Sequence, residues 1–372
     1  MDRFYIGTWK NASDPARLLV IPQKGDRPRQ TMDLPGNISF LKLEKGRLYV
    51  LLNGDPEVRS GCGGVLHIYG LQPDGKMRLL QKSSTYGAEP IELSLQETTV
   101  AIVNHGSTTN RVCRTRRLPD GTLEPVWVYD EASLVLLERL PDGTVGKLLD
   151  RYEFTGHGAV PFFQESAAPH SIFYSKENGL LLVPERGSDR TTLFSVENGR
   201  LIRKGALPEQ QGYGPRNAVM TRDGQHVYVV DEILPSVSHY RAPFGAAIQR
   251  TSTVSTQAAS FCSRDPRSFA APHPVALWLS GDERFLYTLT RSTETLSVFR
   301  RSQATGELHM LQEWKLAGTN PRQALVDGNR LYIVLMDSRS LSRLTLSEAT
   351  GEVLKEETLL DGINAIAVAD GL

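Results

Sequence analysis

The chain has 372 residues, of which 40% are hydrophobic and 23% charged, and its 42 basic side chains balance its 42 acidic ones. This composition is typical of a globular protein long enough to bury a sizeable core. A formal charge of zero excludes the pervasive basic field of a nucleic-acid binder, so we expect no nucleic acid partner.

The N-terminal residues 1–8 lack the apolar core and the small-residue cleavage site of a secretory signal. No apolar run approaches the length that a membrane span needs. We therefore expect a cytoplasmic protein without a membrane partner. Three cysteines, Cys62, Cys113 and Cys262, are too few and too scattered to predict a disulfide framework or a cysteine zinc site.

A short pattern recurs along the chain: an approach segment, often opened by proline, then a polar turn and an aromatic-aliphatic strand. Clear copies span residues 38–50, 215–230, 274–287 and 321–334, and weaker copies begin at Glu89 and Pro169. Such repetition is typical of a supersecondary unit that buries its apolar face only by stacking on copies of itself.

A seventh copy is divided between the two termini. Residues 363–371 form the first half of the pattern, and residues 3–8 form the second half. Pairing these segments closes a ring without an open sheet edge. Seven units average roughly 53 residues each, a length compatible with a four-stranded blade. The sequence thus predicts an all-β, seven-bladed β-propeller in which residues 1–372 form a single domain, and a closed ring favours a monomer.

Continuous apolar runs at residues 48–52, 227–230 and 331–335 predict strands buried on both faces near the centre of the ring. Hairpin turns are predicted where Gly follows Asp or Thr, because Gly accepts a positive φ and Asp bonds its own backbone. These turns lie at Gly75, Gly121, Gly143, Gly224 and Gly351.

Two units are longer than the others. Residues 108–132 predict an inserted hairpin or loop on one blade, whose arginines between residues 111 and 117 either guide an anionic substrate or form solvated surface. The second long connection, residues 241–271, is rich in Ser, Ala and Thr and predicts a loop.

Residues at equivalent positions of different repeats converge around the central channel of a propeller. Four polar residues break the repeat pattern there: His170 and Arg216 follow the proline that opens a repeat, and Glu232 and Arg291 follow an inner apolar strand. A histidine, a carboxylate and two fixed cations suit carbonyl chemistry on an anion. Each residue also has a purely structural interpretation, as a strand cap, a carbonyl partner, a turn residue or a surface ion pair.

The chain resembles the seven-bladed lactonase family, which includes the propeller-type 6-phosphogluconolactonases and the fungal carboxymuconate lactonizing enzymes. Residues 168–190 carry the closest similarity, with Ala-Pro-His-Ser at their start and Val-Pro-Glu-Arg-Gly-Ser-Asp-Arg at their end. Residues 5–8, 214–216, 230–232 and 286–291 extend it over nearly the whole chain. The resemblance implies that His170, Arg216, Glu232 and Arg291 occupy the positions of the family's proposed active site.

The sequence departs from the family pattern in three places. Asn217 stands where the family commonly has His, Ala276-Leu277-Trp278 replace a segment that ends in Ile-His, and Phe163-Gln164 replace an Arg-Gln pair. The candidate substrate-binding residues are His157, Asn104, Asn217, Glu185 and Arg322.

The resemblance implies hydrolysis, or the reverse closure, of a small anionic lactone such as 6-phosphogluconolactone or a carboxylated muconolactone. The expected partner is thus a small anionic lactone or sugar-acid substrate. Arg216 and Arg291 are expected to hold the carboxylate or phosphate, and either Glu232 or His170 takes a proton from water. No cofactor and no metal is expected, because the eight histidines form no His-x-His group. The alternative is a noncatalytic propeller that binds a metabolite or a protein, since the fold by itself supplies no chemistry.

Overall fold

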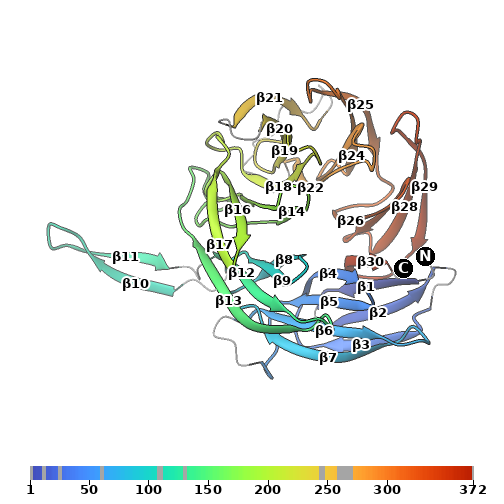
Figure 1. Cartoon of the computed structure of the whole chain (residues 1–372), viewed down its shortest axis with the longest axis horizontal. Helices are drawn as coiled ribbons and strands as arrows, with labels where there is room; N and C mark the ends of the chain where they lie inside the picture. The colour runs from blue at the N-terminus through green and yellow to red at the C-terminus, as the bar shows by residue number, and fades with distance from the viewer. Residues whose placement is uncertain are drawn as a thin grey trace.

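The computed structural model describes residues 3–10, 14–23, 27–58, 63–106, 112–128, 132–242, 248–257 and 271–370. These ranges contain thirty strands and no helix. Twenty-eight of the strands form seven four-stranded antiparallel sheets, which surround a central axis as blades (Figure 1). The predicted all-β, seven-bladed propeller is confirmed. Within the same ranges, no helix has the length and hydropathy that crossing a membrane requires.

The blades are numbered here from the one that closes the ring, and their strands are given from the channel outward. Blade 1 consists of β30 (Ala365–Asp370), β1 (Arg3–Thr8), β2 (Ala16–Pro22) and β3 (Gln30–Leu34). Blade 2 consists of β4 (Ile38–Glu44), β5 (Arg47–Leu52), β6 (Val65–Leu71) and β7 (Met77–Ser84). Blade 3 consists of β8 (Pro90–Leu95), β9 (Thr99–Asn104), β12 (Ala132–Arg139) and β13 (Val145–Phe154).

Blade 4 consists of β14 (Phe173–Ser175), β15 (Leu180–Glu185), β16 (Arg190–Glu197) and β17 (Arg200–Ala206). Blade 5 consists of β18 (Pro215–Met220), β19 (His226–Asp231), β20 (Ser236–Arg241) and β21 (Gln249–Ser255). Blade 6 consists of β22 (His273–Leu279), β23 (Phe285–Arg291), β24 (Thr295–Arg301) and β25 (Leu308–Lys315). Blade 7 consists of β26 (Pro321–Asp327), β27 (Arg330–Leu335), β28 (Ser340–Leu346) and β29 (Val353–Leu360).

Pairing of the first strand with the last closes the ring, as the divided repeat predicts. β1 and β30 are antiparallel, with Tyr5 opposite Ala369 and Ile6 opposite Val368. Figure 1 shows the two chain ends side by side in blade 1. Alternate side chains of β1 pack in opposite directions: Tyr5 contributes to a core cluster with blade 2, and Ile6 to one with blade 7.

The predicted apolar strands are the second strands of their blades, one position outward from the channel. In β5, β19 and β27 the apolar side chains are buried without exception. A second strand lies between two neighbouring blades and therefore needs an apolar residue on each face. The approach segments form the innermost strands, which border the channel and can carry polar side chains.

The predicted hairpin turns are present at all five positions. The glycines have positive φ values between 70° and 90°. Asp74, Asp120, Asp142 and Asp223 each accept a hydrogen bond from the amide two residues further on. Aspartate and glycine thus stabilise the same reversal of the chain by different means.

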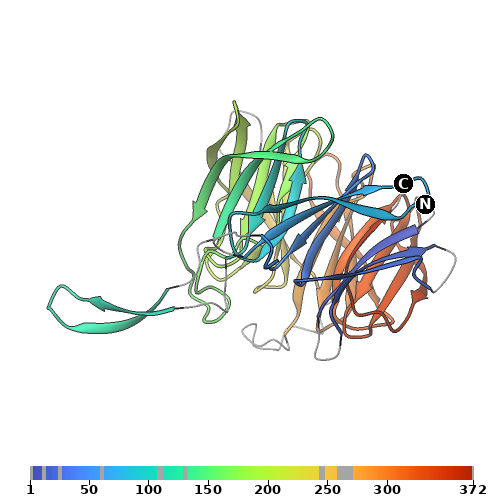
Figure 2. The same cartoon turned by 90° about the horizontal axis from the view of Figure 1, so that it is seen from below.

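The inserted segment of blade 3 forms a separate hairpin of β10 (Val112–Arg117) and β11 (Leu123–Val128). Figures 1 and 2 show this hairpin projecting outward from the ring, away from the central axis. Arg116 pairs there with Glu124, and Arg114 and Arg117 are exposed. The described arginines of the insertion therefore form solvated surface. Cys113 on β10 is an exposed free thiol, whereas Cys62 and Cys262 lie outside the described residues.

The prediction of a loop over residues 241–271 is wrong for residues Gln249–Ser255, which form β21, the outer strand of blade 5. Side chains of β21 alternate between exposed and half-buried, so the strand lacks the apolar run that marked the buried strands. Its alternating threonines, Thr251 and Thr253, favour extended backbone and were the signal available in the sequence.

The packing of β1 between blades predicts a large effect of truncating Ile6, which is fully buried. We expect Ile6→Ala to lower the free energy of unfolding by about 3 kcal/mol, through lost burial and the cavity left behind. Leu354→Ala is the matched control, because Leu354 is 65% exposed on β29 and its loss should cost about 0.5 kcal/mol or less. Urea denaturation measures both values, and equal effects would contradict the closed ring.

Candidate functional site

A shift of register recurs where each innermost strand pairs with its second strand. In blade 5, Pro215 lies opposite Asp231 and Asn217 opposite Val230, so that Arg216 has no opposite residue. The same β-bulge occurs in every other blade except blade 4. There, Pro169 bridges to Glu185 and places His170 at the corresponding position. A bulge redirects its extra side chain out of the regular strand alternation.

The residues at this position all line one cavity in the channel. They form the bulge ring: Ser39, Ile91, His170, Arg216, Val275, Arg322 and Ile366. In each blade, one residue of the second strand pairs with the innermost strand immediately before the bulge position. The residue that comes next in the chain after this paired residue belongs to a second set. This set forms the strand-end ring: Trp9, Asn53, His105, Arg186, Glu232, Arg291 and Met336. All of the strand-end ring except Met336 lines the same cavity.

The cavity has a volume of about 730 Å³, which suits a small organic ligand. Blades 4 to 7 supply the histidine, the four arginines and the glutamate that form the charged arc: His170, Arg186, Arg216, Glu232, Arg291 and Arg322. Two further carboxyl groups, those of Glu89 and Glu92, line the wall beside blade 3. Apolar residues make up much of the remaining wall, among them Phe40, Leu277 and Trp278. The cavity therefore offers positive charge on one side and an apolar surface elsewhere.

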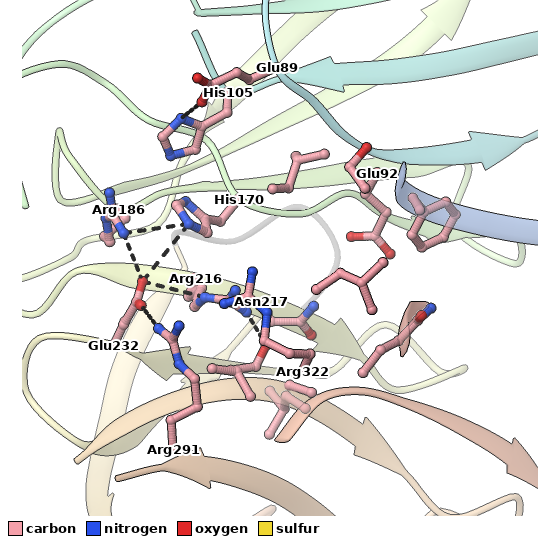
Figure 3. Close-up of a pocket in the computed structure, with 18 of the residues that line it drawn as sticks. Glu89, Glu92, His105, His170, Arg186, Arg216, Asn217, Glu232, Arg291 and Arg322 are labelled. Carbon is pink, nitrogen blue, oxygen red and sulfur yellow. Dashed lines mark hydrogen bonds and ion pairs between the residues drawn. The ribbon is translucent and has the colours of Figure 1, made fainter. Parts of the chain in front are cut away.

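Glu232 is the centre of the charged arc, and its side chain is only 1% exposed. Arg291 Nη2 donates to its Oε1 at 2.6 Å, and Arg186 Nη1 donates to its Oε2 at 3.2 Å. Arg216 Nε lies 3.4 Å from Oε2 (Figure 3). Burial by itself would raise the pKa of Glu232, but the three guanidinium groups hold it well below its usual value. The carboxylate is therefore ionised at neutral pH.

His170 lies beside this carboxylate in its neutral form. Its Nδ1 is 3.1 Å from the carbonyl oxygen of Ala168, so Nδ1 donates its proton there and Nε2 keeps a lone pair. Nε2 lies 4.0 Å from Glu232 Oε2 and 3.5 Å from Arg186 Nη1. Burial, reinforced by the charge of Arg186, lowers the pKa of His170 well below its usual value. His170 can thus accept a proton at neutral pH.

A second histidine packs against His170. The ring of His105 stands edge-on to it, with the centroids 4.4 Å apart. Its Nδ1 lies 3.0 Å from the carbonyl oxygen of Gly106 and 3.8 Å from Glu89 Oε2. Burial, together with the charge of Arg186, lowers the pKa of His105 to about 4. Both histidines are therefore uncharged at neutral pH, and the arginines carry the positive charge of the cavity.

Arg322 differs from the other arginines of the charged arc. Its guanidinium lies 5.7 Å from the centre of the Trp9 ring, and within the described residues no hydrogen bond or ion pair engages it. Burial lowers the pKa of Arg322 to about 10, so it remains a cation at neutral pH. Four guanidinium groups face one ionised Glu232 in this arc, and the excess of positive charge suits an anionic ligand.

The structure brings together the four residues predicted to be catalytic, His170, Arg216, Glu232 and Arg291, in one cavity. Two predicted substrate-binding residues, Asn217 and Arg322, also line it. Their convergence follows from the repeated register, because equivalent strand positions reach the same depth in the channel.

Three predicted substrate-binding residues do not line the cavity. Asn104 is buried in blade 3, where Nδ2 donates to the Thr85 carbonyl oxygen and to Ser133 Oγ. Glu185 is buried in blade 4 and accepts a hydrogen bond from Ser188 Oγ at 2.7 Å. Asn104 and Glu185 each immediately precede a lining residue, and neighbouring side chains of a strand point to opposite faces.

The third, His157, is exposed, and its Nδ1 lies 3.3 Å from the carbonyl oxygen of Gly158. It belongs to the connection between β13 and β14, outside the bulge and strand-end rings. The strand register that places the lining residues around the channel therefore does not apply to His157.

Sequence reasoning missed Arg186, His105 and Glu92. Arg186 and His105 occupy the same strand-end position as Glu232 and Arg291, and uniform comparison of the repeats at this position would have identified them. Glu92 lies on β8 next to the bulge residue Ile91, and no sequence pattern marks its place in the cavity wall. Among the described residues, no group of three or more His, Cys, Asp or Glu side chains is arranged to hold a metal ion.

The contacts of Glu232 predict that Glu232→Gln destabilises the fold, because three guanidinium groups lose their balancing charge. We expect the free energy of unfolding at neutral pH to fall by about 3 kcal/mol. Because the folded state depresses the pKa of Glu232, this contribution is present above about pH 4 and is lost as the pH falls further. Glu197→Gln, which removes an exposed partner of Lys204, is the control and should leave the free energy of unfolding close to that of the wild type. Urea denaturation at pH 7 and pH 3 measures both, and a Glu232→Gln loss equal to the control would contradict the assigned contacts.

Known proteins resemble this chain in both sequence and fold. Residues 4–369 match the family model for Lactonase, 7-bladed beta-propeller. The chain is 26% identical over 251 residues to the 6-phosphogluconolactonase of Formosa agariphila, a match that covers 64% of this chain and 68% of that protein. It is 23% identical over 194 residues to the 6-phosphogluconolactonase of Bacillus subtilis, which covers 52% of this chain and 53% of that protein.

A solved structure extends the similarity to the whole ring. The periplasmic gluconolactonase PpgL of Pseudomonas aeruginosa superposes with a TM-score of 0.79 at 19% identity, covering 98% of this chain and 97% of that chain. At this identity the likeness concerns the fold alone. Because the family model spans nearly the whole sequence, the chain belongs to the seven-bladed β-propeller lactonase family.

Proposed function

We propose that the protein hydrolyses a small anionic lactone in the central cavity. The observation that carries the proposal is a neutral His170, with a lone pair on Nε2, which lies 3.5 Å from Arg186 Nη1 and within the electrostatic influence of Arg216. Such a site combines a proton acceptor with positive charge for an anionic substrate and for the oxyanion of ester cleavage. Two relatives named 6-phosphogluconolactonase make a phosphorylated sugar lactone the proposed substrate.

We assign the role of base to His170 rather than to Glu232. Both oxygens of Glu232 already accept hydrogen bonds from arginines, whereas Nε2 of His170 keeps a lone pair. The Glu232 carboxylate instead orients the arginines and balances the positive charge that His170 gains when it takes a proton from water. Glu232 is thus a positioning residue.

The arginines are proposed to have two roles, stabilisation of the oxyanion and binding of the phosphate. Arg216 and Arg291 both contact Glu232, which lies beside His170. These two arginines would offset the negative charge that develops on the carbonyl oxygen of the substrate. Arg322 has no anionic partner of its own within the described residues and would bind the phosphate of the substrate. A carboxylated lactone is also an anion, and both classes, with the reverse ring closure, belong in the test.

The noncatalytic alternative rests on the departures at Asn217 and Trp278, both of which line the cavity. Trp278 stacks on Tyr287, with ring centroids 5.7 Å apart, and presents an apolar ring where the family has a histidine-containing segment. A cavity of this kind can bind an anionic metabolite without transforming it. The rate measurements below distinguish the two functions.

The remaining expectations stay predictions. We propose a monomer, because the closed ring leaves no innermost strand without a partner in its blade. A cytoplasmic location, independence of metals and cofactors, and the lack of a nucleic acid partner rest on the sequence alone.

The first test follows acid release from fresh 6-phosphogluconolactone and from several carboxylated lactones near neutral pH, against spontaneous hydrolysis. We expect the wild type to accelerate at least one of them and His170→Gln to lower kcat by about 10²- to 10⁴-fold, because the variant lacks the proton acceptor. A wild-type rate equal to the spontaneous rate for every lactone would support the noncatalytic alternative. Wild-type rates in His170→Gln would contradict its role as base.

Substrate affinity tests the role of Arg322. We expect Arg322→Met to raise KM for the phosphorylated lactone by about tenfold or more with a smaller change in kcat, because the phosphate contact is present before and during the reaction. Arg116→Met is the matched control, since Arg116 lies on the projecting hairpin and is 62% exposed. If both variants have wild-type KM values, Arg322 does not bind the substrate.

A further inference from the structure

A second carboxyl group of the cavity, Glu92, has surroundings opposite to those of Glu232. It lies on β8, next to the bulge residue Ile91, and its side chain lines the cavity wall. Figure 3 shows its carboxyl group directed into the pocket, apart from the cluster around Glu232. Within the described residues, no Lys, Arg or His forms an ion pair with it. Glu232 by contrast contacts three guanidinium groups.

A backbone hydrogen bond fixes the place of this carboxyl group. The amide of Ile172 donates to Glu92 Oε2 at 3.1 Å, across the boundary between blades 3 and 4. Ile172 lies two residues after His170 in the chain, and Glu92 and His170 both line the cavity. One oxygen is thereby anchored to the backbone, and the carboxyl group as a whole faces the space that a substrate would occupy.

The surroundings of Glu92 favour its protonated form near neutrality. Burial raises the pKa of Glu92 to about 7, against the Ile172 amide and the more distant charges of Lys42 and Arg216. Lys42 comes from β4 and Arg216 from β18, and the neighbouring strand β9 carries no charged residue. When the environments of two carboxyl groups in one site push their pKa values apart, the two groups suit different roles in proton transfer.

We propose that Glu92 is the proton donor of this site and protonates the ring oxygen of the lactone as the ring opens. The inference rests on the proposed lactone hydrolysis and adds to it the group that completes the reaction. The arginines are poor proton donors, whereas the carboxyl group of Glu92 faces the cavity and has a pKa near neutrality.

The protons balance over one turnover. The oxygen of water bonds to the carbonyl carbon while His170 Nε2 takes one of its protons. The bond between the carbonyl carbon and the ring oxygen then breaks, its electron pair stays on the ring oxygen, and Glu92 gives that oxygen a proton. His170 and Glu92 return to their starting forms by exchange with solvent, and the new carboxylic acid releases one proton.

The pH profile of Glu92→Gln gives the main test. In the wild type we expect kcat to fall as the pH rises through about 7, because Glu92 loses the proton that it must donate. Glu92→Gln should lower kcat by about 10²-fold at pH 6 and abolish this alkaline limb. Glu92→Asp, which keeps a carboxyl group, should recover part of the rate. Glu177→Gln, in the exposed turn between β14 and β15, is the matched control and should match the wild type.

A comparison of leaving groups separates proton donation from a structural role. An aryl lactone releases a phenolic oxygen that needs little protonation, so the defect of Glu92→Gln should shrink by at least tenfold relative to an alkyl lactone. A variant that merely distorts the cavity would lose activity equally on both. Infrared difference spectra between pH 5.5 and 8.5 should also show a carboxyl group that titrates in the wild type and is missing in Glu92→Gln.

The outcomes separate this inference from the proposed function. If the wild type hydrolyses a lactone and Glu92→Gln keeps its rate and pH profile, the role of Glu92 is refuted and the lactonase proposal stands. Equal loss on alkyl and aryl lactones, or an unchanged infrared difference, also refutes it. A wild type that accelerates no lactone refutes both proposals together.

Discussion

Six of the seven blades meet the central channel through the same shifted strand register, and in blade 4 the bridge between Pro169 and Glu185 takes its place. This register decides which side chains reach the cavity. In blade 5 the shift leaves Arg216 without an opposite residue, and in blade 7 it does the same for Arg322. Closure of the ring by β1 and β30 places these positions at a common depth. A site that gathers residues from most of the chain therefore depends on backbone pairing repeated blade by blade, more than on any local motif.

Burial of several guanidinium groups around one carboxylate is the second constraint. Removing ions from water is costly, and the contacts of Glu232 with Arg186, Arg216 and Arg291 offset that cost only when the group is complete. Since Glu232 balances a single charge, the cavity keeps an excess of positive charge. The same contacts that stabilise the arginines therefore prepare the site for an anion and keep Glu232 from acting as an efficient base.

Two carboxyl groups in one cavity show how strongly the surroundings decide chemistry. Glu232, among arginines, stays ionised, whereas Glu92, half-buried with the Ile172 amide as its hydrogen-bond partner, has a pKa of about 7 and is partly protonated near neutral pH. His170 is neutral because burial and Arg186 both disfavour its charged form. A proton acceptor and a proton donor thus line the same cavity in complementary states, as ester hydrolysis requires.

Sequence alone determined the propeller, because repeats, divided termini and apolar strand patterns are local properties of the chain. It also singled out His170, Arg216, Glu232 and Arg291, because polar residues stand there at inner positions of the repeat. It misplaced Asn104 by one residue, since a strand's periodicity of two turns a one-residue error into the opposite face. Only the tertiary structure decided which residues share the cavity and which are ionised, because blade contacts and burial, which sequence patterns do not encode, set both.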